Sequence, residues 1–301
     1  MRFLSALLLC PAILSAGRQV AITIDDLPRG GDRGPQDLAA IRRMTADLLK
    51  PFREQKIPLI GFVNEGRVET LGRGGLRQIL DLWLDAGADL GNHSYSHFNI
   101  DDVPLDQYTA DIVKGESVLR EALAARGKKL KFFRHPYLHT GATPEIRRGL
   151  QDFLDRQGYR VAPVTFDTSD WEYAALYTVP RFRDRVRREY VPYMESIAAF
   201  FEQRSREVVG REVPQILLIH ASQMNADLMP ALLEMFRRRG YEFIPLEQAL
   251  KDSAYRLPDG YTGKKGISWI HRWGVAKGME MKAEPDPAKW VEEAFQSTRS
   301  R

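Results

Sequence analysis

The sequence predicts an α/β fold: a distorted barrel of the (β/α)7 type, formed by one domain with a C-terminal extension. Three observations lead to this fold class. At 301 residues the chain has a length at which α/β barrels commonly form a single domain. Short apolar runs rich in β-branched and aromatic residues alternate with longer segments of helical periodicity. This alternation is typical of parallel strands joined by right-handed crossovers, and seven such runs suggest a barrel.

The predicted elements follow one another along most of the chain. The strands are Val20–Ile24, Leu59–Val63, Ala88–Gly91, Leu130–Phe133, Arg160–Phe166, Gln215–Ile219 and Tyr241–Ile244. The helical segments include Leu38–Phe52, Leu76–Leu84, Tyr108–Ala125, Pro144–Gln157 and Ala226–Arg239. The Arg-rich segment Pro180–Arg211 is interpreted as a solvated helix whose Ile197, Phe200 and Phe201 turn inward.

The N-terminus has the pattern of a signal peptide. Arg2 precedes the apolar run Leu4–Leu14, which is too short to span a bilayer and is followed by small residues. The alternative is a buried N-terminal strand or helix. We predict that residues 1–17 are a signal peptide, that the protein is secreted to the periplasm or outside the cell, and that it has no stable membrane insertion after cleavage. Because Cys10 is the only cysteine, the mature protein would have to hold any metal with His and carboxylate ligands.

The composition gives weaker indications about partners and about the C-terminal region. The net charge of +4 favours an acidic partner such as an anionic cell-wall polymer. No Lys/Arg run is interleaved with aromatic residues, so a nucleic-acid partner is not predicted. We expect the barrel domain to cover residues 18–250 and residues 251–301 to form an extension packed on it. Trp269 and Trp273 in this extension have two interpretations, packing against the barrel or stacking on sugar rings.

Polar residues follow five of the predicted strands. In parallel α/β barrels the C-terminal ends of the strands converge on one face, where active sites lie. We therefore expect these residues to share one pocket although almost two hundred positions separate the first from the last. They are Asp25-Asp26, the stretch Asn92–His97, the stretch Arg134–Tyr137, the stretch Asp167–Trp171, and His220.

Two histidines and an acidic pair in this set suggest a metal site. His93 and His97 are four residues apart, so on a helical first turn both imidazoles would project from one face. Histidines at this spacing often lie on surfaces, and acidic pairs often cap helices. However, Asp25 and Asp26 end an apolar strand, where adjacent carboxylates repel unless a cation neutralises them. Two His and one carboxylate suit Zn2+, and Co2+, Ni2+ or Fe2+ would also fit.

These motifs resemble the polysaccharide deacetylases, also called NodB-homology or carbohydrate esterase family 4 enzymes. Five motifs of that family occur in order at predicted strand ends, between Thr23 and His220. They are Thr23-Ile24-Asp25-Asp26, His93-Ser94-Tyr95-Ser96-His97, Arg134-His135-Pro136-Tyr137, Asp167-Thr168-Ser169-Asp170-Trp171 and Leu217-Leu218-Ile219-His220.

The resemblance implies a distorted barrel and metal-dependent hydrolysis of N- or O-acetyl groups on sugars. The residues that match the family's metal ligands are Asp26, His93 and His97. The residues that match its catalytic groups are Asp25 as base, His220 as acid, Arg134 orienting Asp25, and Asp170 tuning this network. The residues that match its substrate contacts are Tyr137, whose backbone N–H would stabilise the oxyanion, and Trp171 and Leu218, which would enclose the acetyl methyl.

The motifs also show departures from the family and leave alternatives open. Ala221 stands where many relatives carry Asp, and His135 is unusual within its motif, with substrate contact, exposure and packing all open. The substrate could be a chitin oligomer, peptidoglycan or acetylated xylan. Two other functions compete with this one: a hydrolase of the same mechanism acting on a non-sugar N-acyl compound, and a carbohydrate-binding pseudoenzyme.

Overall fold

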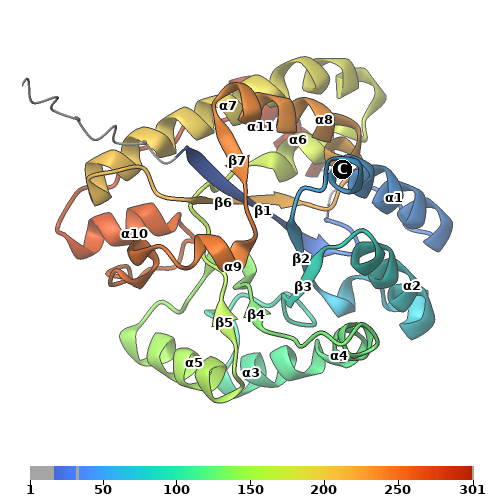
Figure 1. Ribbon diagram of the computed structural model, residues 1–301, viewed down its shortest axis with the longest axis horizontal. Helices are drawn as coiled ribbons and strands as arrows, with labels where there is room; N and C mark the ends of the chain where they lie inside the picture. The colour runs from blue at the N-terminus through green and yellow to red at the C-terminus, as the bar shows by residue number, and fades with distance from the viewer. Residues whose placement is uncertain (1–16, 32–33, 300–301) are drawn as a thin grey trace, which may run out of the picture.

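The computed structural model describes residues 17–31 and 34–299 (Figure 1). All but the last residue of the predicted signal peptide lie outside the described residues. Among the helices that the structure does describe, none combines the length and the apolar character needed to cross a bilayer.

A seven-stranded parallel sheet forms the centre of the molecule (Figure 1). Its main path has the order β5-β4-β3-β2-β1-β6, and β7 pairs with the start of β1. An isolated bridge between Phe166 and Leu217 links the segment after β5 to β6, so the sheet curls into the distorted barrel that the sequence predicts. The strands are β1 (Arg18–Leu27), β2 (Leu59–Val63), β3 (Asp89–Asn92), β4 (Phe132–Phe133), β5 (Arg160–Val161), β6 (Gln215–His220) and β7 (Tyr241–Phe243).

Helices surround the curled sheet (Figure 1). The α-helices are α1 (Leu38–Gln55), α2 (Gly72–Asp85), α3 (Leu105–Lys114), α4 (Ser117–Ala124), α5 (Pro144–Arg156), α6 (Asp170–Tyr177), α7 (Pro180–Val209), α8 (Gln223–Arg238), α9 (Leu246–Ala249), α10 (Trp269–Ala276) and α11 (Lys289–Arg299). Three short 3-10 helices are η1 (Glu65–Leu71), η2 (Pro136–Leu138) and η3 (Ser253–Arg256).

The strand side chains alternate between two apolar clusters, as the period of two requires. Ile22 and Ile24 belong to the large core under the helices, whereas Ala21 lies in a smaller cluster with Ile216. The same smaller cluster contains Leu246 of α9, so α9 closes the interior of the sheet at the end opposite the strand C-termini. This packing leaves the C-terminal ends of the strands as the open end.

Two predicted elements differ from the structure. The helix predicted over Tyr108–Ala125 is two helices, α3 and α4, that are interrupted around Gly115. A Cβ on Gly115 would lie 2.7 Å from the backbone carbon of Ser94, so this break lets the chain approach the loop after β3 closely. The strand predicted over Arg160–Phe166 pairs regularly only at β5, because its second half leaves the sheet edge and keeps a single bridge.

The C-terminal region packs against the helices of the barrel. Helix α10 contacts α7, and α11 contacts α6. Trp269 and Trp273 are both buried, with Trp273 only 1% exposed, so the packing interpretation of this pair is correct. Within α7, Ile197 and Phe201 are buried as predicted, and Phe200 is partly buried and packs against the same core.

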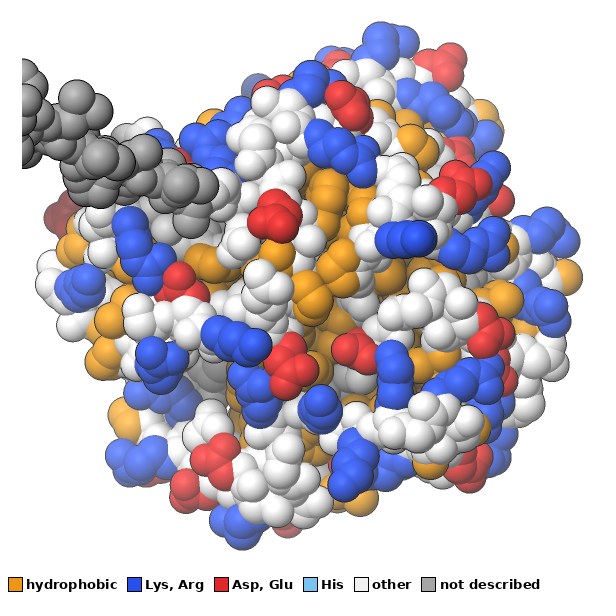
Figure 2. Space-filling view, in the orientation of Figure 1, with side chains coloured by type: hydrophobic (Ala, Val, Ile, Leu, Met, Phe, Trp, Pro, Cys, Tyr) orange, Lys and Arg blue, Asp and Glu red, His pale blue; other side chains and the backbone are white. Residues whose placement is uncertain are grey.

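Charged side chains are spread over the molecular surface. Figure 2 shows Lys and Arg scattered over one face, with acidic and neutral side chains between them. The net charge of +4 is therefore not gathered into one basic patch on this face.

Candidate active site

The polar residues that follow the strands meet at one cavity. Asp25 of β1 pairs in parallel register with His220 of β6, which places the two side chains side by side at the strand ends. The cavity has a volume of about 620 Å³. Ten of the residues that line it are Asp25, Asp26, Arg67, His93, His97, Tyr137, Trp171, Leu218, His220 and Phe295. Arg134 and Asp170 lie behind this wall and are fully buried.

His93 and His97 converge through an irregular loop, and the prediction of a helical turn here is wrong. Ser94 and His97 have left-handed backbone conformations, with φ of 64° and 55°. The Ser94 hydroxyl accepts a hydrogen bond from the His97 N–H, and the Asp111 carboxylate accepts one from Ser96. The two imidazole rings lie edge to face with centroids 4.8 Å apart. The positions of the two rings are therefore set by side-chain acceptors, Ser94 of the loop and Asp111 of α3, and not by the hydrogen bonds of a helix.

Asp26, His93 and His97 form the group that we call the metal site. Their ligand atoms lie within 4.8 Å of one another. Oδ1 of Asp26 is 3.7 Å from Nε2 of His93 and 3.5 Å from Nε2 of His97. Tetrahedral ligands with bonds of about 2.1 Å lie roughly 3.4 Å apart, so these separations suit a bound divalent ion.

The surroundings of the metal site also fit a cation. Oδ1 of Asp26 is buried and has no hydrogen-bond partner among the described residues. Nδ1 of His93 lies 2.9 Å from the Arg134 carbonyl, an acceptor that directs the ring proton to Nδ1 and leaves the Nε2 lone pair free. Burial lowers the pKa of His93 well below its ordinary value, and the pKa of His97 is lowered for the same reason. Both rings are therefore neutral, which is the form that binds metals.

Arg67 is a neighbour of the metal site that the sequence analysis missed. Its guanidinium forms an ion pair of 2.7 Å with Oδ2 of Asp26, the oxygen that does not face the histidines. Burial alone would raise the pKa of Asp26, but the positive charge of Arg67 opposes burial, and the pKa lies below its ordinary value. Arg67 lies in η1, shortly after the end of β2. The signal that could have found Arg67 is the one that marks the other motifs: a polar residue shortly after a predicted strand, here β2.

Asp25 is a buried carboxylate beside the metal site. Its Oδ2 lies 3.8 Å from Nε2 of His93 and 3.8 Å from Nη1 of Arg134, and its Oδ1 is buried without a hydrogen-bond partner. Burial raises the pKa of Asp25 to about 6, although the charge of Arg134 opposes the rise. Arg134 itself donates a hydrogen bond of 2.7 Å to the Thr23 hydroxyl. Its effect on Asp25 is therefore electrostatic rather than that of a direct hydrogen bond.

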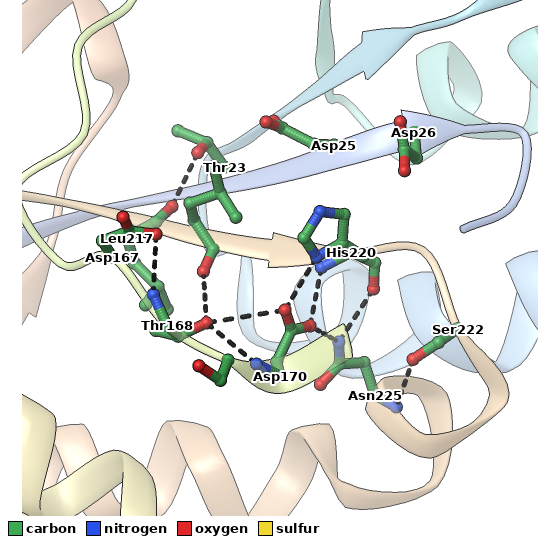
Figure 3. Close-up of polar contacts among 12 residues, drawn as sticks. Thr23, Asp25, Asp26, Asp167, Thr168, Asp170, Leu217, His220, Ser222 and Asn225 are labelled. Atoms are coloured by element: carbon green, nitrogen blue, oxygen red, sulfur yellow. Dashed lines mark hydrogen bonds and ion pairs between the residues drawn. The ribbon is translucent and has the colours of Figure 1, made fainter. Parts of the chain in front are cut away.

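His220 is held by Asp170, which stands between the His220 ring and Asn225 (Figure 3). Oδ1 of Asp170 lies 2.7 Å from Nδ1 of His220, and Oδ2 accepts hydrogen bonds from the His220 N–H and from Asn225. Ser222 caps α8 and so places Asn225 in its first turn. Burial works against protonation of His220, but the charge and hydrogen bond of Asp170 outweigh it and raise the pKa of His220 to about 9. Asp170 thus binds His220 directly, whereas the sequence predicted only that Asp170 tunes the network of the catalytic residues.

Tyr137 and Leu138 have an unusual backbone at the cavity edge. Both are left-handed, with φ of 54° and 56°, a conformation that costs a non-glycine residue of order 1–3 kcal/mol. The amides of Leu138 and His139 donate to the carbonyls of His135 and Pro136. Among the hydrogen bonds of the described residues, none uses the Tyr137 N–H, which remains available to a ligand in the cavity.

The apolar wall of the cavity combines predicted and unpredicted residues. Leu218 is buried, and Trp171 of α6 is 41% exposed. The Trp171 ring packs edge to face on Phe295 of α11, with centroids 4.9 Å apart. Phe295 therefore brings the C-terminal extension into the cavity wall, a contact between distant segments that no local motif indicates.

The sequence of residues 15–152 matches the polysaccharide deacetylase family. The chain is 23% identical over 244 residues, 79% of its length and 70% of the relative's, to a peptidoglycan-N-acetylglucosamine deacetylase of Bacillus cereus. Residues 15–152 are therefore similar in sequence to the polysaccharide deacetylase domain. Members of this class hydrolyse acetyl amide or ester bonds of polysaccharides, and the chain is classed as a hydrolase with them.

Solved structures support the barrel fold of this chain. A polysaccharide deacetylase from Bacillus cereus superposes with a TM-score of 0.51 at 20% identity, over 76% of this chain and 91% of that one. A carbohydrate esterase family 4 pseudoenzyme from Bacillus anthracis superposes with a TM-score of 0.51 at 17% identity, over 78% and 66% of the two chains. Likeness at this level of identity shows the fold alone.

Two further histidines, His135 and His139, line the cavity. His135 is buried and nearly parallel to Trp269, with ring centroids 6.5 Å apart, and burial lowers its pKa to about 3. His135 is therefore a packed, neutral residue at the back of the cavity rather than an exposed one. Nδ1 of His139 lies 2.7 Å from Oδ1 of Asn99.

Proposed function

We propose that this chain hydrolyses N-acetyl groups on a glycan of the peptidoglycan or chitin type. In this proposal Asp25 is the base and His220 is the acid, and they flank the metal site. The register of β1 and β6 carries the proposal, because it sets Asp25 beside His220 at one cavity. A base and an acid held at one cavity are what hydrolysis of an amide requires.

The metal site would contribute Lewis acidity. When bound there, a divalent metal lowers the pKa of water from about 15.7 to roughly 7 and polarises the acyl carbonyl. The donor set of one carboxylate and two imidazoles favours Zn2+, and Co2+, Ni2+ or Fe2+ also fit it.

Asp25 and His220 divide the two proton transfers between them. Asp25 accepts a proton as water adds to the acetyl carbonyl carbon, and its unpaired Oδ1 is available for that proton. As the C–N bond breaks, His220 gives its proton to the leaving amine, so that acetate and a free amino sugar are formed. Asp170 keeps His220 protonated for this step through the charge and hydrogen bond described above.

Residues on the other sides of the cavity would bind the acetyl group. The free N–H of Tyr137 is placed to stabilise the negative charge that develops on the carbonyl oxygen. Trp171 and Leu218 offer an apolar surface for the methyl group. The protonated state of His220 supports an amide substrate, because an amine leaves only after protonation, whereas an alkoxide depends on it less. The peptidoglycan relative from Bacillus cereus supports the same choice.

The substrate is tested by measuring acetate release from three acetylated glycans: N-acetylglucosamine oligomers, peptidoglycan fragments and acetylated xylan. We expect the metal-loaded protein to act on one of the first two at least tenfold faster than on xylan. Release from xylan alone would contradict the N-acetyl proposal. Turnover of small N-acyl amines but of no glycan would favour the non-sugar hydrolase, and sugar binding without turnover would favour a pseudoenzyme.

A pH profile tests the pairing of His220 with Asp170. His220 is protonated below its pKa of about 9, so kcat should fall as the pH rises through that value. Because Asp170 is the strongest group that raises this pKa, Asp170→Asn should move the alkaline limb to lower pH by at least one unit and lower kcat at neutral pH. Asp25 and Asp26 also raise the pKa of His220, and because both remain in Asp170→Asn, only part of the rise should be lost.

A matched control uses the same substitution outside the cavity. Asp227 of α8 pairs with Tyr177 and Arg187, away from His220. Asp227→Asn should leave the alkaline limb in place. An Asp170→Asn variant with an unmoved limb would show that His220 is not the acid.

We also propose that the protein is exported, which the sequence pattern of residues 1–17 and the choice of a cell-wall glycan support. Expression of the full chain in a bacterial host should yield mature protein that begins near residue 18, outside the cytoplasm. N-terminal sequencing and cell fractionation would check this. Recovery of the intact chain in the cytoplasm would contradict export.

A further inference from the structure

A segment of the C-terminal extension lies directly against the strained backbone at the cavity edge. A Cβ placed on Gly266 would lie 1.8 Å from the carbonyl oxygen of Tyr137 and 2.9 Å from Cβ of Leu138. No side chain fits into this gap. Gly266 therefore forms a wall behind Tyr137, on a segment far from it in sequence.

Arg272 of α10 binds the same backbone from a fully buried position. Its Nη2 donates a hydrogen bond of 2.7 Å to the Leu138 carbonyl, and its Nη1 donates to the Thr140 hydroxyl at 3.0 Å. Nη1 also contacts Asp259 at 3.0 Å, and the guanidinium lies 4.5 Å from the centre of the Trp269 ring. A planar guanidinium fixed on several sides holds its acceptors in one geometry.

Apart from the two turn hydrogen bonds to the His135 and Pro136 carbonyls, little else fixes the conformation of Tyr137. Its side chain is 56% exposed, and its ring contacts only the rings of His97 and His139 among the aromatic neighbours in the described chain. Two adjacent left-handed residues persist only where the surrounding structure determines them. Gly266 and Arg272 add this tertiary constraint to the hydrogen bonds of the turn itself.

We propose that Arg272 and Gly266 are positioning residues that hold Tyr137 and Leu138 in the left-handed conformation and so aim the Tyr137 N–H at the reacting carbonyl. The catalytic part of this inference rests on the proposed deacetylation. A donor set in advance of the reaction stabilises developing charge without reorganising. The C-terminal extension is then part of the catalytic machinery and not only a cover for the barrel.

Substitution of Gly266 tests the wall. Gly266→Ala should displace the Tyr137 carbonyl and lower kcat by roughly 10-fold to 100-fold, with KM changed less than about twofold. The matched control is Gly274→Ala in the same extension, where a Cβ would meet its nearest atom at 3.4 Å and far from Tyr137. This control should keep the wild-type kcat. Equal kcat for Gly266→Ala and wild type would overturn the proposal.

Hydrogen exchange tests whether Arg272 holds the backbone of Leu138, and it does so without depending on activity. The variant Arg272→Lys keeps the positive charge but loses the planar guanidinium that donates through two nitrogens. The Leu138 and His139 amides should then exchange at least about tenfold faster, while the strand amides stay protected. Unchanged exchange at these two amides would overturn the proposal, even if kcat falls. If the wild-type protein releases no acetate while Asp26, His93 and His97 bind metal, the proposed function fails. Hydrogen exchange at the Leu138 and His139 amides then still tests whether Arg272 positions this backbone.

Discussion

Replacement of Asp25 by Asn is expected to lower kcat by about 10³-fold while metal is retained, because a positioned base contributes on the order of 10² to 10⁴ in rate. Asn has nearly the same shape but cannot accept the proton. The carboxyl of Asp25 is almost fully buried, and burial raises its pKa to about 6, close to the pH at which a base works best. Steady-state acetate release, normalised to bound metal, measures the loss.

The control for this variant is another carboxylate in the same cavity. Asp167 lines the cavity but has no role in the proposal. Burial raises its pKa to about 7, with the charge of Glu284 adding to the rise, so its neutral form is already populated near neutral pH. Asp167→Asn should therefore keep kcat within about tenfold of wild type. A fully metal-loaded Asp25→Asn that hydrolyses as fast as this control would exclude Asp25 as the base.

The sequence identified the strand ends because burial leaves a strong local pattern. Each strand is an apolar run, and a polar residue directly after it is conspicuous, as with Asp25 after Ile24 and His220 after Ile219. Parallel strands then bring residues that are distant in sequence to one face without any knowledge of the contacts. This is why the metal site and its two flanking groups could be predicted together.

The parts that could not be predicted depend on long-range contacts. The loop from His93 to His97 takes its shape from Asp111 and from the close approach of Gly115, neither of which is marked by the spacing of the histidines. Phe295 reaches the cavity from the C-terminal extension, and Arg272 of the same extension binds the Leu138 carbonyl at the cavity edge. No strand pattern in this region indicates the direction of the chain. Local periodicity carries no information about such contacts.

Zinc is expected to raise the thermal stability of the metal-free protein and to restore acetate release that a chelator abolishes. Oδ1 of Asp26 is buried without a partner, and the two neutral imidazoles face it, so the folded chain holds a preformed donor set that the unfolded chain lacks. Binding to the folded state alone stabilises it by about 2.7 kcal/mol at a zinc concentration of 100 times Kd. Calorimetric titration and thermal unfolding with and without zinc measure both effects.

A pair of histidine variants separates ligation from general polarity of the cavity. His97 has Nε2 3.5 Å from Oδ1 of Asp26, whereas His139 lines the same cavity and is bound to Asn99 instead. His97→Ala should weaken zinc binding by at least about 100-fold and remove the stabilisation, and His139→Ala should change neither. Equal zinc affinity in the two variants would place the metal elsewhere.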